Sequence, residues 1–179
     1  MRTQPTLIAA ILLVGAATLR AQAPVAAAAP SLVSTQRYLA GRFRLQLEHA
    51  VAKGAARPAR QALVTFMRKE VLPYLAQEGA AVYPVVDSVV GTNGYATIAA
   101  SFDQAAITRR VDRLQASIGA KDPAQFVGEA YALAALLDAY FEREQHLVQP
   151  MLRSDLSRKE IASLIAHVNA AVPDQHSGI

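Results

Sequence analysis

Two tyrosine–glutamate pairs are the residues of this sequence best suited to chemistry. Tyr74 precedes Glu78 by four positions, and Tyr140 precedes Glu144 in the same way. On a helix, residues four apart lie about 40° apart and one turn above each other, so the two members of each pair point the same way. A phenol and a carboxylate so placed can hydrogen-bond, or they can offer oxygen ligands to a hard metal ion.

The two pairs belong to an internal repeat of the chain. A valine and a proline follow both pairs at matching distances, namely Val82 and Pro84, and Val148 and Pro150. The segments before the pairs also correspond, because Gln36, Leu39, Arg42 and Phe43 match Gln104, Ile107, Arg110 and Val111 at a constant offset. Two related segments of this length predict two similar helical hairpins in one bundle.

The repeat predicts a polar cluster inside the bundle. If each hairpin directs one glutamine, one tyrosine and one glutamate inward, the cluster contains Gln36, Tyr74, Glu78, Gln104, Tyr140 and Glu144. Burying two carboxylates is unfavourable unless they are paired, hydrogen-bonded or bound to a metal. The sequence therefore predicts either a metal site or a hydrogen-bonded network.

Good helix formers dominate the chain, and glycine and proline lie mostly between periodic segments. We predict an all-α fold, an up-down four-helix bundle of two similar αα-hairpins over residues 34–152, followed by a short C-terminal helix over 154–173. Pro73 should kink or break the second helix. The predicted bundle helices run from about Ser34 to Lys53, from Pro58 to about Ser88, from Tyr95 to about Gly119, and from Pro123 to about Leu152. Ser157 and Glu160 predict a capping box for the last helix.

The N-terminal residues have the pattern of a secretory signal. Arg2 is followed by an uncharged apolar run of about 13 residues, which is shorter than the roughly 20 that a membrane span needs. We predict a signal peptide over 1–27 and a tether over 28–33. An uncleaved N-terminal anchor is the alternative. The expected location is outside the cytoplasm, in the periplasm, with no stable membrane anchor after cleavage.

Composition excludes several functions. The chain has no cysteine, which excludes disulfides, thiolate ligands and a cysteine nucleophile. Its formal net charge is +4, but the basic residues are scattered among acidic ones without interleaved aromatics, so we expect no nucleic-acid partner. No nucleophile motif or phosphate-binding loop is present. Acid–base catalysis by Glu78 and Glu144 has no cleft signal to support it, so the functional prediction does not include an enzymatic activity.

The pattern over residues 32–152 is similar to the hemerythrin-like (HHE cation-binding) family. Family members carry a histidine on the first helix and a His-x-x-x-Glu pair on the second, followed by Val/Leu-Tyr-Pro, and then repeat this arrangement. Members often have Leu-Pro before the second-helix histidine, and Leu72-Pro73-Tyr74 is similar to that segment. Val82-Tyr83-Pro84 matches the segment after the pair, and Glu78 and Glu144 match the bridging carboxylates. The resemblance implies a non-heme di-iron centre used in oxygen binding, iron handling or redox sensing. All four histidine positions differ, being Gln36, Tyr74, Gln104 and Tyr140.

Three hypotheses follow for the cluster. It binds a hard ion such as Fe³⁺, Mn²⁺ or Ca²⁺ through oxygen ligands alone, it is a metal-free network, or the bundle is an interaction module or binds an organic ligand. Our functional prediction is an exported hemerythrin-like bundle that binds non-heme iron for iron handling or redox and oxygen sensing. The alternative is a metal-free degenerate bundle serving as a structural or interaction module. The histidines present, His49, His146, His167 and His176, are predicted to lie on the surface or rim.

Overall fold

The computed structural model describes residues 31–92, 94 and 96–172. Within these residues the chain is helical and contains no β-strand, which confirms the predicted all-α class. The predicted signal peptide, residues 28–30 of the tether, His176 and Pro173 lie outside the described residues. The helices are α1 (Leu32–Ala52), α2 (Arg57–Phe66), η1 (Met67–Val71), α3 (Leu72–Val90), α4 (Ile98–Ala116), η2 (Ser117–Gly119), α5 (Pro123–Arg143), η3 (Glu144–Val148), α6 (Gln149–Asp155) and α7 (Arg158–Asn169).

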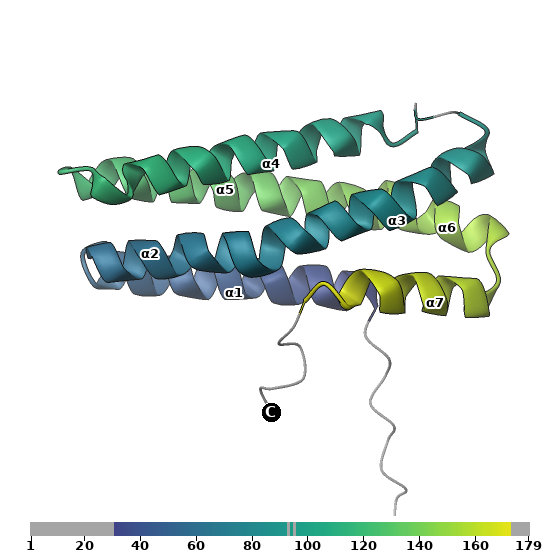
Figure 1. Ribbon diagram of the computed structural model, residues 1–179, viewed down its shortest axis with the longest axis horizontal. Helices are drawn as coiled ribbons and strands as arrows, with labels where there is room; N and C mark the ends of the chain where they lie inside the picture. The colour runs from purple at the N-terminus through teal and green to yellow at the C-terminus, as the bar shows by residue number, and fades with distance from the viewer. Residues whose placement is uncertain (1–30, 93, 95, 173–179) are drawn as a thin grey trace, which may run out of the picture.

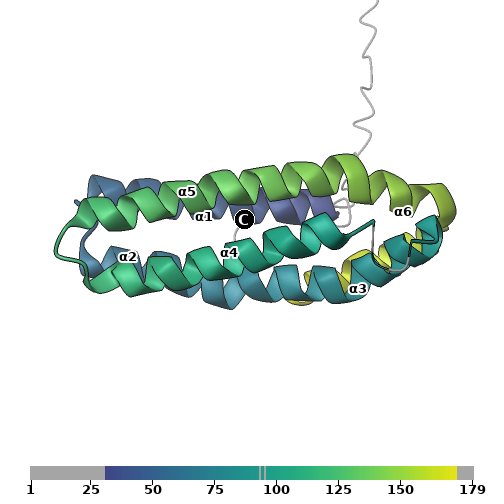
Figure 2. The ribbon, with the colours of Figure 1, turned by 90° about the horizontal axis from the view of Figure 1, so that it is seen from above.

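The long helices lie side by side as a bundle (Figures 1 and 2). α1 packs against α2 and α5, while α4 packs against α5 on one side and against α2 and α3 on the other. α7 returns along α3 and reaches α1. One apolar core fills the space between the helices, with Leu39, Leu63, Ile107 and Leu133 among its fully buried members. Within the described residues, no helix combines the length and apolar character that crossing a membrane requires.

Helix α1 begins earlier than predicted. We expected Ser34 as its N-cap, but the cap is Ser31, whose hydroxyl accepts a hydrogen bond from the Ser34 N–H at 3.0 Å. The Ser34 hydroxyl accepts from the Ser31 N–H in return, at 2.7 Å, so two serines form a reciprocal capping box. Residues 32 and 33 of the predicted tether therefore belong to the first turn of α1. The predicted stop is correct, because the helix ends at Ala52 and Gly54 takes a positive φ of 62°.

Helix α4 begins later than predicted, at Ile98 instead of Tyr95. The Asp87 carboxylate closes the preceding loop by accepting from the Ala96 N–H at 3.1 Å and the Thr97 hydroxyl at 2.6 Å. The Ala96 N–H and the Thr97 hydroxyl are thus hydrogen-bonded to Asp87, and the regular helix begins only after them. At its other end the regular helix stops at Ala116, and the final turn to Gly119 is a 3₁₀ turn.

Two wide π-helical turns interrupt the long helices next to prolines. The Leu72 N–H bonds to the Met67 carbonyl five residues back, just before Pro73. The Gln149 N–H bonds to the Glu144 carbonyl in the same way, just before Pro150. Proline has no N–H and crowds the carbonyl four residues before it, and a wider turn accommodates both effects. The break expected at Pro73 is therefore present, and a second one, not predicted, begins at Glu144 itself.

A buried arginine links two turns between helices at the end of the bundle opposite α6. Arg60 donates to the Ala55 carbonyl and, at 3.1 Å each, to the carbonyls of Ile118 and Ala120. Its guanidinium lies 5.7 Å from the centre of the Phe126 ring. One side chain thus joins the α1–α2 turn to the α4–α5 turn.

The last helix is shorter than the predicted 154–173, since it runs from Arg158 to Asn169, but its capping box is as predicted. The Ser157 hydroxyl accepts from the Glu160 N–H at 3.3 Å, and the Glu160 carboxylate accepts from the Ser157 N–H at 2.9 Å. These two bonds are the predicted capping box. The bonds from Ser157 lower the pKa of Glu160, because they favour its charged form.

Candidate functional site

The six predicted side chains belong to one buried network. It draws on α1 for Gln36, α3 for Tyr74 and Glu78, α4 for Gln104, α5 for Tyr140, and η3 for Glu144. Five of the six are buried, and Gln104 is half-buried. The histidines lie apart from it, because His49, His146 and His167 are exposed. The surface placement predicted for these three histidines is confirmed.

Glu78 is the centre of one half of the network. Its Oε1 accepts from the Gln36 amide N–H at 2.8 Å and from the Tyr74 hydroxyl at 2.9 Å, while its Oε2 accepts from the Tyr140 hydroxyl at 2.7 Å. The four-residue spacing of Tyr74 and Glu78 thus produces a direct contact. Complete burial raises the pKa of Glu78, and its three donors act in the opposite direction.

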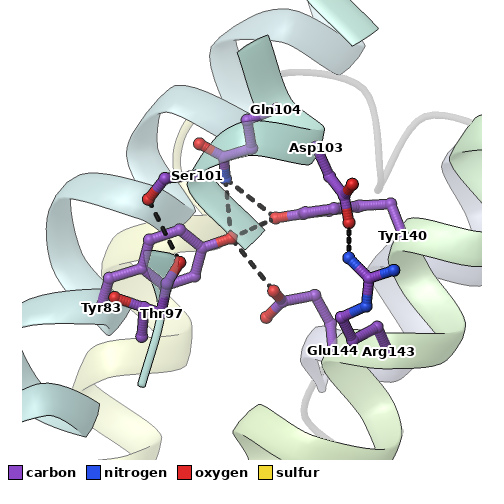
Figure 3. Close-up of polar contacts among 8 residues, drawn as sticks. All are labelled: Tyr83, Thr97, Ser101, Asp103, Gln104, Tyr140, Arg143 and Glu144. Carbon is purple, nitrogen blue, oxygen red and sulfur yellow. Dashed lines mark hydrogen bonds and ion pairs between the residues drawn. The ribbon is translucent and has the colours of Figure 1, made fainter. Parts of the chain in front are cut away.

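The second pair is arranged differently from the first. We expected Tyr140 to face Glu144, but the Tyr140 hydroxyl has a single proton and donates it across the bundle to Glu78. Glu144 Oε1 instead shares a hydrogen bond with the Tyr83 hydroxyl, at 3.0 Å (Figure 3). Burial and the nearby Glu78 raise the pKa of Glu144 to about 8, against smaller opposing effects of Tyr83 and Arg143.

Tyr83 is the functional residue that the sequence prediction missed. Its hydroxyl lies 2.7 Å from the Tyr140 hydroxyl and links the two halves of the network (Figure 3). Tyr83 follows Glu78 by five residues, which places it about 140° around the helix, so helical spacing does not predict a shared face. The sequence feature that could have pointed to Tyr83 is the Val82-Tyr83-Pro84 segment, which resembles the family pattern. Its partner in the repeat is Val148-Gln149-Pro150, so the repeat is not symmetric here.

Gln104 presents its nitrogen to the cluster. The amide Nε2 donates to the Leu75 backbone carbonyl at 2.9 Å, to the Tyr140 hydroxyl at 2.8 Å and to the Tyr83 hydroxyl at 3.0 Å (Figure 3). A backbone carbonyl can only accept, so its contact fixes which end of the amide faces inward. The oxygen end lies over Gly79, where an added Cβ would be only 2.8 Å from Gln104 Oε1.

We expect Gly79→Ala to be destabilising, although glycine-to-alanine changes inside helices usually stabilise by about 1 kcal/mol. The new methyl group must displace the Gln104 amide, which would lose its bonds to two tyrosines. The matched control is Gly128→Ala in α5, where an added Cβ would meet no atom within 4 Å. Chemical denaturation should show Gly128→Ala more stable than the wild type and Gly79→Ala less stable by about 1 kcal/mol. Equal gains in both variants would contradict the close approach of Gln104 to α3.

The side chains, as arranged, do not form a metal-ligand set. Both glutamines turn their amide nitrogen, which is a donor, toward the cluster. The Tyr74 and Tyr140 hydroxyls give their protons to Glu78, and burial and the nearby carboxylates raise both tyrosine pKa values well above the ordinary one, which disfavours phenolate. In the described part of the chain, no three histidine, cysteine, aspartate or glutamate side chains gather in a way that could hold a metal ion.

Two features border the network. An ion pair between Arg143 and Asp103 lies beside Glu144 and joins α5 to α4 (Figure 3). On the other side, Gln36 lines a surface groove of about 310 Å³ between α1 and α5, whose walls include Gly41 and the Arg44–Asp138 ion pair. The Gln36 Oε1 atom is buried and has no hydrogen-bond partner among the residues that the structure describes.

Comparison with protein-family models, with curated proteins and with solved structures finds no match for this chain. The resemblance to the hemerythrin-like family therefore stays a prediction from the sequence.

Proposed function

We propose that this chain is a metal-independent relative of the hemerythrin-like bundles, acting outside the cytoplasm as a structural or interaction module. In this proposal a network of tyrosines, glutamines and glutamates takes the place of the di-iron centre. The observation that carries it is the set of three donors that converge on Glu78 from Gln36, Tyr74 and Tyr140. They compensate the buried charge in the way that a cation otherwise would.

The proposal includes the finer architecture of the bundle. α1 with the rod formed by α2 and α3 is one hairpin, α4 with α5 is the other, and the four rods alternate in direction as an up-down bundle. The packing of α1 on α5 and of α4 on α2 and α3 supports this arrangement, because each rod then has two neighbours. α7 is a trailing helix on the outside.

The network suits a module whose shape must be constant. Its members come from all four rods, so the hydrogen bonds form only when the helices have one relative register. Buried polar groups are costly when left unpaired, and this cost disfavours other packings of an otherwise apolar interior. Large apolar side chains remain on the outside, including Ile98 and Phe102, one turn apart on α4 and 46% and 66% exposed. They offer a surface for a protein partner.

Metal analysis with thermal melting tests the proposal. Protein purified without an affinity tag should contain no stoichiometric iron, manganese or calcium, and its melting temperature should be the same with chelator as with each ion. A bound ion at 100-fold saturation would instead stabilise the fold by about 2.7 kcal/mol. The control is the double variant Glu78→Gln, Glu144→Gln, which keeps side-chain shape and removes the charges.

We expect this double variant to be as stable as the wild type or more stable, because neutral amides can replace both carboxylates in the hydrogen-bond pattern. A metal found in the wild type and absent from the double variant would contradict the proposal. That result would support the iron site predicted from the sequence, with its role in iron handling or sensing.

A further inference from the structure

Four oxygen atoms form a continuous chain through the middle of the network. Glu144 Oε1 lies 3.0 Å from the Tyr83 hydroxyl, which lies 2.7 Å from the Tyr140 hydroxyl, which lies 2.7 Å from Glu78 Oε2. All are hydrogen-bond distances, so each of the three contacts needs one hydrogen between its oxygens. Gln104 cannot remove this requirement, because its Nε2 only donates to the two tyrosines from the side.

The number of hydrogens fixes the protonation of the two carboxyl oxygens at the ends of this row of oxygen atoms. Two phenols supply two hydrogens for three contacts, so the third must come from a carboxyl group. If both glutamates were ionised, each tyrosine would donate to its own carboxylate and two hydroxyl oxygens would face each other at 2.7 Å without a hydrogen. If Glu144 Oε1 and Glu78 Oε2 both carried a proton, one phenol hydrogen would have no acceptor. All three contacts are satisfied only when one of these two end oxygens carries a proton.

The surroundings decide which glutamate carries that proton. Glu78 receives two further donors, from Gln36 and Tyr74, which stabilise a negative charge there. Glu144 has no such additional donor in the described part of the chain, where its hydrogen-bond contact is with the Tyr83 hydroxyl and the neighbouring Arg143 is paired with Asp103. The hydrogens therefore run in one direction, from Glu144 through Tyr83 and Tyr140 to Glu78.

We propose that this row of four oxygen atoms is a proton-binding site that holds one proton on Glu144, and that this proton stabilises the contact between α3 and α5. When Glu144 loses its proton, Tyr83 must donate to the new carboxylate and can no longer donate to Tyr140. The O–H bond of Glu144 is the one that breaks, and its proton passes to solvent. The contact between Tyr83 on α3 and Tyr140 on α5 then has no hydrogen, and the two oxygens repel. Proton binding thereby becomes coupled to helix packing.

This inference rests on the metal-independent network proposed above, and infrared spectroscopy of the chelator-treated chain tests it. A protonated carboxylic acid has a C=O stretching band separate from that of carboxylates, and this band shifts in D₂O. We expect one such buried acid in the wild type at neutral pH and none in Glu144→Gln. The matched control is Glu142→Gln, an exposed neighbour on α5, which should retain the band.

Tyr83→Phe supplies the second measurement, because it removes the acceptor of the Glu144 proton without touching either carboxyl group. The acid band should persist and move to higher frequency, as a carboxyl group does when it loses its hydrogen-bond acceptor. Three results would overturn the proposal: no acid band in the wild type, a band that survives Glu144→Gln, or a band that Tyr83→Phe leaves in place. Metal content is measured on the same samples before chelation. Bound metal would contradict the metal-independent function, whereas a missing acid band in metal-free protein would contradict only the proton-binding site.

Discussion

Tyr140→Phe is expected to lower the free energy of unfolding by about 3 kcal/mol. The Tyr140 hydroxyl has three contacts in the network, to Glu78, Tyr83 and Gln104. Removing it takes one of three donors from the buried Glu78 carboxylate, and one hydrogen-bond partner each from the Tyr83 hydroxyl and the Gln104 amide. A hydrogen bond to a charged group contributes about 1.5–3 kcal/mol and one between neutral groups about 0.5–1.5 kcal/mol, and part of the loss is recovered when neighbours relax.

Urea denaturation measures this effect against Tyr131→Phe, the matched control on the same helix. Tyr131 is 52% exposed, so removing its hydroxyl should change stability by less than about 0.5 kcal/mol. The cost of Tyr140→Phe should also fall in a Glu78→Gln background, because the acceptor that loses its donor is then neutral. Equal stability of the two tyrosine variants would mean that the network contributes nothing to the fold.

Much of the site could be predicted from the spacing of residue types. Tyr74 and Glu78 contact each other because a four-residue spacing on one helix nearly guarantees a shared face. The repeat then brought Gln36, Gln104, Tyr140 and Glu144 to the same interior, because related hairpins bury related positions. The capping box at Ser157 was equally local, depending on residues three apart and on nothing distant.

The features that could not be predicted depend on contacts between helices. Tyr140 satisfies Glu78 and not Glu144, and this choice exists only because Tyr83 reaches Glu144 from another helix. The wide turn at Glu144 has its cause in Pro150, but Pro84, at the corresponding place in the first repeat, is accommodated inside the regular α3 helix. Proline predicts a disturbance there, and packing decides its form.

The direction of the glutamine amides is the detail on which the functional interpretation depends. A glutamine facing the cluster could offer its oxygen to a cation or its nitrogen to a carboxylate, and the sequence is the same in both cases. The Leu75 carbonyl orients Gln104, and Glu78 orients Gln36. Both constraints are three-dimensional, so the sequence alone does not show which end of each amide faces the cluster.

The stability of this protein is expected to fall as the pH rises from 5 to 8. Burial raises the pKa of Glu144 to about 8 from an ordinary value of 4.5. Between these two values the folded chain binds a proton that the unfolded chain has released, so the folded state gains stability on acidification. The contribution is complete below pH 4.5 and is lost as the pH rises through 8. The raised pKa of Glu78 acts with the same sign.

The expected loss between pH 5 and pH 8 is on the order of 3 kcal/mol, because one pKa unit corresponds to about 1.4 kcal/mol. For a domain of this size, that amounts to a fall in melting temperature of about 10 °C, measurable by circular dichroism. Glu144→Gln should reduce the slope to the part that comes from Glu78, since the amide does not titrate, while the exposed control Glu142→Gln should keep the full slope. A wild type that becomes more stable as the pH rises over this range would show that Glu144 is already ionised at pH 5. The contact between Tyr83 and Tyr140 would then need a source of hydrogen other than a carboxyl group.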